Sequence, residues 1–304
     1  MKKGIIVAIL LFFGGLLSFA QEAPEIQFTE YNLDNGLHVV LHEDHSTPIV
    51  TVSVMYHVGA KNEKPNRTGF AHFFEHLMFE GTKHIDRGEY SKYVEKAGGT
   101  LNANTTQDRT YYYEVLPSNQ LALGLWLESE RMLHAKVDSA GIATQKSVVI
   151  EEKKQRYDNK PYGDVLIQTM KRAFKEHPYR WTTIGSAEHI RAAEDQEFQE
   201  FYNMFYVPNN AVLTIAGDID PEETRELVDK YFAGIPEGEK EIYRPDEVEP
   251  IKNKEIRDTV YDNIQLPAVI QAYHTPAIDD KDYYAVDMLS ALLSKGQSSR
   301  LYKT

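Results

Sequence analysis

Residues 69–82 of the chain read GFAHFFEHLMFEGT, and the segment HFFEH at 72–76 places two imidazoles and a carboxylate within about one helical turn. Apolar residues recur through this stretch at helical spacing, which predicts a helix over 69–79. A helix turns by about 100° per residue, so the side chains of His72 and His76 lie about 40° apart on one face. Both imidazoles can therefore reach one metal ion, and Glu75 can reach a water on that ion.

The residue types around this helix favour zinc. The chain contains no Cys, so imidazole and carboxylate are the zinc ligands that remain. A catalytic zinc needs three protein ligands and one open position for water, and a long charged helix predicted over 139–157 offers Glu151 and Glu152. Spacing alone does not choose between these two. The alternative is that His72 and His76 are simply two histidines on a partly buried helix face.

The other histidines show no paired spacing that suggests ligation, and they are interpreted as surface or packing residues. They are His38, His42, His45, His57, His84, His134, His177, His189 and His274.

The rest of the pattern predicts strands followed by alternating helices and strands. Strands are expected at 26–33, 37–42, 49–58, 100–106, 110–116 and 210–216, with a hairpin turn at 34–36. Residues 59–67 are expected to form a loop. Further helices are expected at 89–96, 119–133, 163–175, 195–206 and 221–232.

Residues 234–253 are rich in Glu, Lys and Pro and predict an interdomain linker. After it, strands are expected at 259–262 and 269–274 and a helix at 283–293. These elements indicate only the beginning of a second domain, which stops at Thr304.

Residues 1–20 have the layout of a signal peptide cleaved after Ala20. Lys2 and Lys3 precede an apolar run from Gly4 to Leu17, and small residues close the segment. The alternative is a retained membrane anchor, but the run is short for a span and polar residues follow at once. We therefore expect an exported, periplasmic protein without stable membrane insertion. Because there is no Cys to carry a lipid, we do not expect a lipoprotein.

The composition bounds the function from another side. The formal net charge is −13, and no block of Lys and Arg is present. An acidic chain of this kind is a poor nucleic-acid binder, so we expect no nucleic-acid partner. A hydrophobic content of 42% supports a sizeable folded core.

Several stretches, taken together and in order, resemble the pitrilysin/insulinase family of zinc metallopeptidases, which includes the mitochondrial processing peptidase. Residues 69–82 resemble the family's inverted zinc motif, H-x-x-E-H. Further matches are the active-site strand pair at 98–105 and 108–112, the helix of the distal glutamate ligand at 147–152, and the end of the first domain at 206–211 and 215–218. The resemblance extends over residues 27–304.

This resemblance implies roles for individual residues. The family's distal ligand follows the second histidine by roughly seventy-odd residues, and here 152 − 76 = 76. The Val-Val-x-x-Glu register at 148–152, which resembles the family's, selects Glu152 over Glu151. The implied site holds one Zn²⁺ per chain on His72, His76 and Glu152, with Glu75 as general base.

Two further positions take their meaning from the family. Substrate is implied to pair as a strand beside Asn102 and Ala103, a segment that would otherwise be interpreted as a plain hairpin. Gln145 stands where the family often has a second-shell glutamate. An amide cannot supply that negative charge, so we expect a less efficient site that still binds metal.

The implied fold class is α+β, a processing-peptidase-like antiparallel or mixed sheet packed with helices. We expect one complete metallopeptidase domain at 26–233, a linker at 234–253 and an incomplete, inactive-type second domain at 254–304. The implied function is a zinc-dependent endopeptidase that hydrolyses peptides or unfolded protein segments.

Two other functions stay open. One is a non-catalytic zinc-binding or substrate-binding subunit that needs a partner chain or the missing C-terminal half. The other is a zinc hydrolase with a non-peptide substrate. The expected partners are peptide substrates, with a homodimer or a heterodimer with a related subunit as the open assemblies.

Overall fold

The protein is described by a computed structural model that covers residues 25–238 and 241–303. The predicted signal peptide at 1–20 lies outside these residues. A six-stranded sheet with the order β1-β2-β6-β3-β5-β4 forms the centre of the structure. The strands are β1 (Thr29–Asn32), β2 (His38–Glu43), β3 (Ile49–Tyr56), β4 (Thr100–Thr105), β5 (Thr110–Pro117) and β6 (Ala211–Gly217). Neighbouring strands run antiparallel except β2 and β6, which are parallel. The expected mixed sheet is confirmed.

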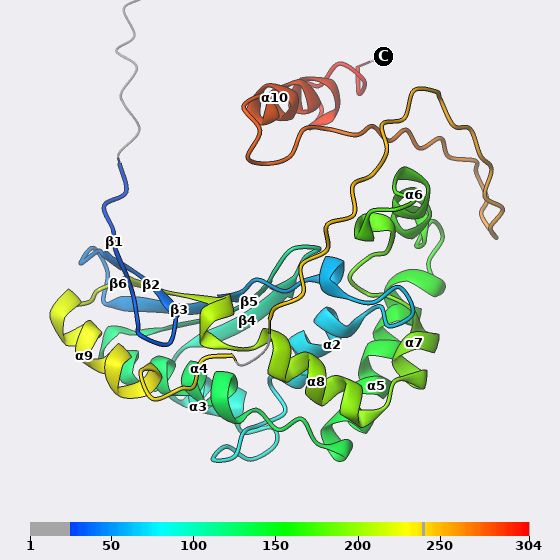
Figure 1. Cartoon of the computed structure of the whole chain (residues 1–304). Coiled ribbons are helices and arrows are strands. Elements are labelled where there is room, and N and C mark those ends of the chain that lie inside the picture. The colour runs from blue at the N-terminus through cyan, green and yellow to red at the C-terminus, as the bar shows by residue number, and fades with distance from the viewer. Residues whose placement is uncertain (1–24, 239–240, 304) are drawn as a thin grey trace, which may run out of the picture.

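Helices lie on one side of this sheet and beyond one end of it. Figure 1 shows α3, α4 and α9 beneath the sheet, and α2, α5, α7 and α8 grouped beside it. The helices are α2 (Phe70–Leu77), α3 (Tyr90–Lys96), α4 (Leu121–His134), α5 (Ser139–Lys153), α6 (Val165–Ala173), α7 (Ala187–Ala192), α8 (Asp195–Phe205), α9 (Pro221–Phe232) and α10 (Tyr283–Ser294). A π-helical turn, η3 (Lys154–Asp158), prolongs α5, and short 3₁₀ turns η1 (Ala60–Asn62), η2 (Ser118–Gln120), η4 (Pro178–Arg180) and η5 (Pro208–Asn210) connect other elements.

One face of the sheet is the core face. Along β5 the residues Thr110, Tyr112, Glu114 and Leu116 are buried, while the residues between them are only partly buried. This alternation with a period of two is typical of an antiparallel sheet that packs helices against one face. Helix α4 is packed against β3 and β5 on that face.

A buried arginine joins this helix layer to the sheet. The side chain of Arg131 in α4 is 1% exposed, and its Nη1 lies 2.6 Å from Oε1 of Glu128, which is fully buried. The guanidinium lies 4.4–4.7 Å from the centroids of three rings, those of Phe79, Tyr90 and Tyr112. A buried charge of this kind is costly unless every partner stays in place, so Arg131 fixes α4 against β5, α3 and the end of α2.

A buried carboxylate holds the beginning of α2. Glu63 is 3% exposed. Its Oε2 accepts the N–H of Gly69 at 2.8 Å, and its Oε1 accepts the N–H of Ala71 at 2.9 Å. The first N–H groups of a helix have no partner within the helix, and here Glu63 supplies it. Gly69 has a φ of 97°, a left-handed conformation that favours glycine.

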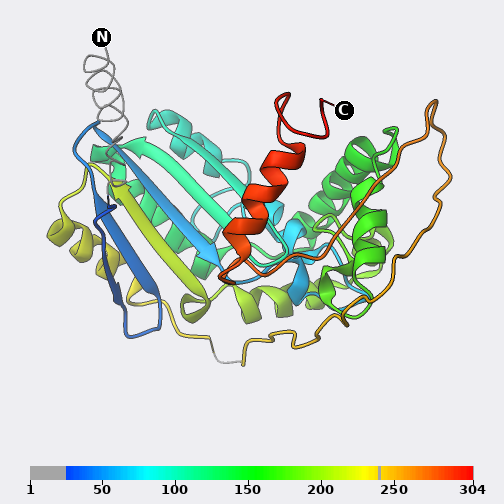
Figure 2. The same ribbon diagram turned by 90° about the horizontal axis from the view of Figure 1, so that it is seen from above.

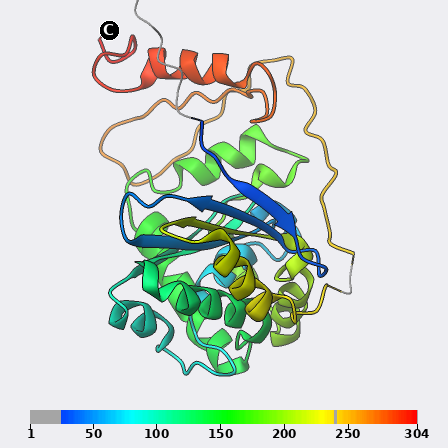
Figure 3. The same cartoon turned by 90° about the vertical axis from the view of Figure 1, so that its left-hand side faces the viewer.

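Two residues of the C-terminal segment 241–303, Asp258 and His274, contact the end of α6. The side chain of Arg172 lies 2.7 Å from Asp258, and the ring of His274 is 2.8 Å from the carbonyl oxygen of Ala173. Helix α10, expected at 283–293, is present in this part of the chain. Figure 3 shows it set apart from the sheet, and in Figure 2, seen from above, it crosses in front of the end of the strands.

The prediction of strands at 259–262 and 269–274 is wrong. Both segments are extended, but within the described residues neither pairs with another strand. Tyr261 is 93% exposed and Val269 is 89% exposed. A strand is stable only when a neighbouring strand takes up its backbone hydrogen bonds and side chains. The described part of the chain offers these segments no such neighbour.

The remaining elements follow the expected order, with several short additions, among them the turns η4 and η5. The loop expected at 59–67 contains the η1 turn, and the short helix α7 was not expected. In the part of the chain that is described, no helix combines the length and the apolar composition that crossing a membrane requires.

We predict that Glu63 makes the stability of the fold depend on pH. Burial raises the pKa of Glu63 to about 8, although the hydrogen bonds from the backbone N–H groups lower it in part. Because this value is above that of the unfolded chain, the carboxyl contributes stability that is full below about pH 4.5 and is lost as the pH rises through about 8.

The measurement is urea unfolding of the wild type and of Glu63→Gln between about pH 5 and pH 9. All other groups titrate alike in the two proteins, so their contribution cancels in the difference between the two unfolding free energies. The wild type should lose a few kcal/mol of unfolding free energy relative to the variant over this range. A relative gain with rising pH would show that the ionised carboxylate is the stabilising form.

Candidate metal centre

Two helices bring the three residues expected as metal ligands together. His72 and His76 lie on α2, and Glu152 lies near the end of α5. Oε2 of Glu152 is 3.5 Å from Nε2 of His72 and 3.2 Å from Nε2 of His76. One ligand atom from each residue lies within 4.8 Å of the other two.

The geometry of these atoms fits a zinc ion. Bonds of about 2.0–2.1 Å at tetrahedral angles place ligand atoms about 3.3 Å apart, and the two measured distances bracket this value. Oε2 of Glu152 is buried and accepts no hydrogen bond, although two imidazole nitrogens face it. Buried polar atoms are normally paired, so an oxygen in this position is suited to a cation.

The protonation states also suit a metal. Burial lowers the pKa of His72 to about 4, so its ring is neutral at pH 7. The His76 ring beside Glu152 lowers the pKa of that carboxyl more than burial raises it. A neutral imidazole and an ionised carboxylate are the forms that bind metal ions.

Glu75 lies between this group and the sheet. Oγ1 of Thr105, the last residue of β4, donates a hydrogen bond of 2.6 Å to Oε2 of Glu75. Burial raises the pKa of Glu75, while the bond from Thr105 lowers it. The contact fixes one carboxylate oxygen against β4 and leaves Oε1 as the second oxygen available to chemistry. No spacing pattern singles out Thr105 as a partner of Glu75, because the two residues are 30 positions apart.

The strand that carries Asn102 and Ala103 is an edge of the sheet, since among the described residues β4 pairs only with β5. The N–H of Ala103 donates to Oδ1 of Asn102 at 2.8 Å. An edge strand presents unpaired backbone groups to which another strand can add. A cavity of about 460 Å³ opens beside β4, and Glu95 of α3 and Leu101 contribute to its lining.

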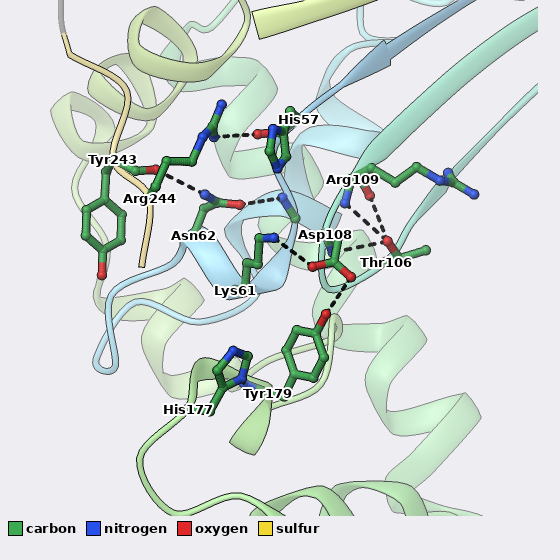
Figure 4. Close-up of polar contacts among 11 residues, drawn as sticks. His57, Lys61, Asn62, Thr106, Asp108, Arg109, His177, Tyr179, Tyr243 and Arg244 are labelled. Carbon is green, nitrogen blue, oxygen red and sulfur yellow. Dashed lines mark hydrogen bonds and ion pairs between the residues drawn. The ribbon is translucent and has the colours of Figure 1, made fainter. Parts of the chain in front are cut away.

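The turn that follows β4 is held in place from several sides. Figure 4 shows Asp108 of this turn between Lys61 and Tyr179. Lys61 Nζ lies 2.8 Å from Asp108 Oδ1, and the Tyr179 hydroxyl donates to Oδ2 at 2.6 Å. Nearby, the Asn62 amide donates to the carbonyl oxygen of Tyr243 at 3.1 Å, which ties the start of the C-terminal segment to η1. The end of the edge strand is therefore fixed close to Glu75.

Gln145 makes its contact away from the three converging side chains. Its amide donates to Oε1 of Glu80 at 2.5 Å, and Oε2 of Glu80 is 2.6 Å from Nε of Arg87. Gln145 therefore links α5 to the segment that connects α2 with α3.

The structure also brings together three residues that the sequence analysis did not connect. His84, Glu130 and His134 each offer a ligand atom within 4.8 Å of the others. Glu130 and His134 are four residues apart on α4, which is a spacing signal for a shared helix face. His84, however, is 46 residues from Glu130, so no local pattern could add it.

Comparisons with known proteins agree with this architecture. Residues 38–186 match the family described as Insulinase (Peptidase family M16), and residues 193–304 match the Peptidase M16 inactive domain. The zinc protease PqqE of Helicobacter pylori is 35% identical over 272 residues, which cover 88% of this chain and 61% of that relative. The chain thus spans less than two thirds of the relative's length.

Solved structures show the same fold. The crystal structure of a protease from Helicobacter pylori matches with a TM-score of 0.81 at 30% identity. The matched region covers 92% of this chain and 68% of the protease chain. The periplasmic protease PqqL from Escherichia coli has a TM-score of 0.66 at 25% identity and covers 76% of this chain and 26% of that chain.

We predict that zinc binding at this centre depends on Glu152 and not on its neighbour Glu151. The carboxylate of Glu151 points elsewhere and pairs with Lys154 at 3.3 Å. Glu152→Gln keeps the size of the side chain but removes its charge, and it should weaken zinc binding by at least about tenfold. Glu151→Gln is the matched control and should bind zinc as the wild type does. The measurement is zinc content after dialysis at buffered free zinc, and equal zinc in both variants would remove Glu152 from the ligand set.

Proposed function

The chain belongs to the insulinase family of peptidases, peptidase family M16, and we propose from this membership and from its site that it is a zinc-dependent endopeptidase. The substrates would be peptides or unfolded protein segments. The observation that carries the proposal is the convergence of His72, His76 and Glu152 on one point, with Glu75 beside them. The relatives named as zinc proteases support the same reaction class.

In this proposal His72, His76 and Glu152 hold one zinc ion. When bound there, the ion polarises the peptide carbonyl and makes a water acidic enough to be deprotonated near neutral pH. The protein's part is to provide two imidazoles and one carboxylate in a largely buried site. The side chains of His72 and Glu152 are 11% and 15% exposed, whereas His76 is 28% exposed, which gives the site one open side.

Glu75 acts as the general base. Thr105 holds its Oε2, so Oε1 takes the proton of the attacking water and later delivers it to the amine that leaves. A base must lie within hydrogen-bond reach of the proton it removes. Because Glu75 precedes His76 directly and contacts the edge strand, the same carboxylate can face both the water and a substrate on β4.

Substrate binds as an added strand along β4. The N–H of Ala103 is taken up by Asn102 in the free protein, and we propose that a carbonyl of the substrate replaces this contact. Backbone pairing gives affinity that depends little on sequence, while pockets beside the strand supply preference. We propose that the cavity lined in part by Leu101 and Glu95 is such a pocket.

We further propose that the protein acts in the periplasm. The support is the basic and apolar composition of residues 1–20 and the similarity to a protease described as periplasmic. Its partners would be peptide substrates and a related subunit or second copy. The second candidate function is a zinc-binding or substrate-binding subunit that needs a partner for catalysis. It is favoured by the similarity to a relative named as a subunit of a complex, the cytochrome b-c1 complex subunit 1 of Bos taurus, which is 29% identical over 215 residues.

We predict that Glu75→Gln keeps zinc and loses peptidase activity. General-base catalysis contributes about 10²–10⁴-fold, and an amide cannot accept the proton. The measurement combines zinc content with cleavage of a quenched peptide library, and Glu151→Gln is the control for loss of one exposed carboxylate. Full activity in Glu75→Gln would end the general-base assignment. Zinc without cleavage even in the wild type would favour the partner-dependent subunit.

We also predict that cleavage depends on backbone N–H groups of the substrate. N-methylation should reduce kcat/KM by about 2–10-fold at each position that pairs with β4, because each removes one hydrogen bond of about 0.5–1.5 kcal/mol. Affected positions should alternate along the peptide, since only every second N–H of a strand faces one neighbour. A uniform response along a cleaved peptide contradicts strand addition and favours a closed pocket for a different substrate.

A further inference from the structure

A second group of metal-ligating side chains lies outside the site described above. It consists of His84, from the connection between α2 and α3, and of Glu130 and His134, from the last two turns of α4. We propose that this outer histidine cluster is a second zinc-binding site. It shares no residue with the proposed catalytic centre, and it does not depend on the chain being a peptidase.

The three side chains already face one another. Oε1 of Glu130 is 2.9 Å from Nδ1 of His84, and the rings of His84 and His134 meet edge to face with centroids 5.1 Å apart. All three ligand atoms lie within 4.8 Å of one another. Ligands on a tetrahedral zinc are about 3.3 Å apart. Small rotations of the two imidazoles are enough to reach that spacing, because the His84 side chain is 49% exposed and free to turn.

The carboxylate at the centre of the cluster is fixed by a second contact. The side chain of Glu130 is only 8% exposed, and its Oε2 accepts a hydrogen bond of 2.6 Å from the hydroxyl of Thr82. Thr82 is itself fully buried. Partners of this kind orient a metal ligand before the ion arrives and raise its affinity. Glu130 therefore presents Oε1 toward the histidines in a defined direction.

The backbone sets the distance between the two segments. The N–H of Lys83 donates to the carbonyl oxygen of His134 at 2.9 Å, and the N–H of Lys136 donates to that of Gly81 at 3.0 Å. Thr82 and Ala135 form an isolated antiparallel bridge between these bonds. The approach of the segment that carries His84 to the end of α4 is thus set by backbone hydrogen bonds.

The ligand set selects the ion by its chemistry. Two imidazoles and one carboxylate suit zinc, whereas Ca²⁺ and Mg²⁺ require oxygen ligands. The exposed side of His84 leaves a position for water, and the single charge of Glu130 attracts a divalent cation. Bound zinc would connect the α2–α3 segment to the end of α4. That segment also carries Glu80, which binds Gln145 of α5. The ion would therefore also restrain the segment that contacts α5.

Zinc stoichiometry of the full chain tests the proposal. Wild-type protein, dialysed against a series of buffered free zinc concentrations, should bind two ions, and the double variant His84→Ala/His134→Ala should bind one. Each single variant should weaken the second ion by at least about tenfold. His38→Ala is the matched control, because His38 is also near a carboxylate, Glu30 at 3.5 Å, but belongs to no group of three potential metal ligands among the described residues.

The two sites are distinguished by repeating the measurement in Glu152→Gln. In this variant one zinc ion should remain, and it should be lost when His84→Ala is added. Zinc should raise the Tm of the Glu152→Gln variant only while the outer histidine cluster is intact. Binding of a single ion that is lost in Glu152→Gln but kept in the double variant overturns the outer site and leaves the proposed function standing. Binding of a single ion that is lost only with His84 and His134 supports the outer site and removes the metal from the proposed catalytic centre.

Discussion

The contact between Glu63 and the first turn of α2 sets the position of the helix on which the site depends. Two backbone N–H groups point to the two oxygens of one buried carboxyl group, so the helix has little freedom to slide or rotate at its start. His72 and His76 follow within two turns and inherit that position. Because a metal site tolerates only a few tenths of an ångström in ligand placement, anchoring of the helix is a precondition for the meeting with Glu152 on α5.

Anchoring of the helix layer explains why a charged cluster is tolerated in the core. Arg131 connects α4 to β5 through Glu114 at 3.8 Å, to Glu128 within α4, and to three aromatic rings. A hydrophobic cluster of equal volume could give similar stability, but it would not require each neighbour to keep one orientation. Three residues later His134 ends α4. The outer histidine cluster is thus built on a helix whose rotation the buried arginine already fixes.

Local patterns predicted most of this architecture because they report local constraints. The spacing of His72, Glu75 and His76 is a property of one helix, and the hairpin at 34–36 is a property of one turn. The choice of Glu152 needed the family resemblance, because no local pattern selects it over Glu151. The contacts of Thr105 with Glu75, and of Glu63 with α2, join elements whose separation only the folded chain defines. The strands expected after residue 253 failed for a related reason, since an extended pattern becomes a strand only beside a partner.

The arrangement of β4 and α2 has a chemical consequence that neither element has alone. Thr105 is the last residue of the edge strand, and its hydroxyl binds the carboxylate that lies next to His76. A peptide that pairs with β4 is therefore aligned with a strand whose end is bonded to the proposed base. The turn at Asp108 prevents that end from moving away. Positioning a reacting group in this way can supply several kcal/mol of a reaction barrier. In the proposed function, the edge strand would therefore align the substrate as well as bind it.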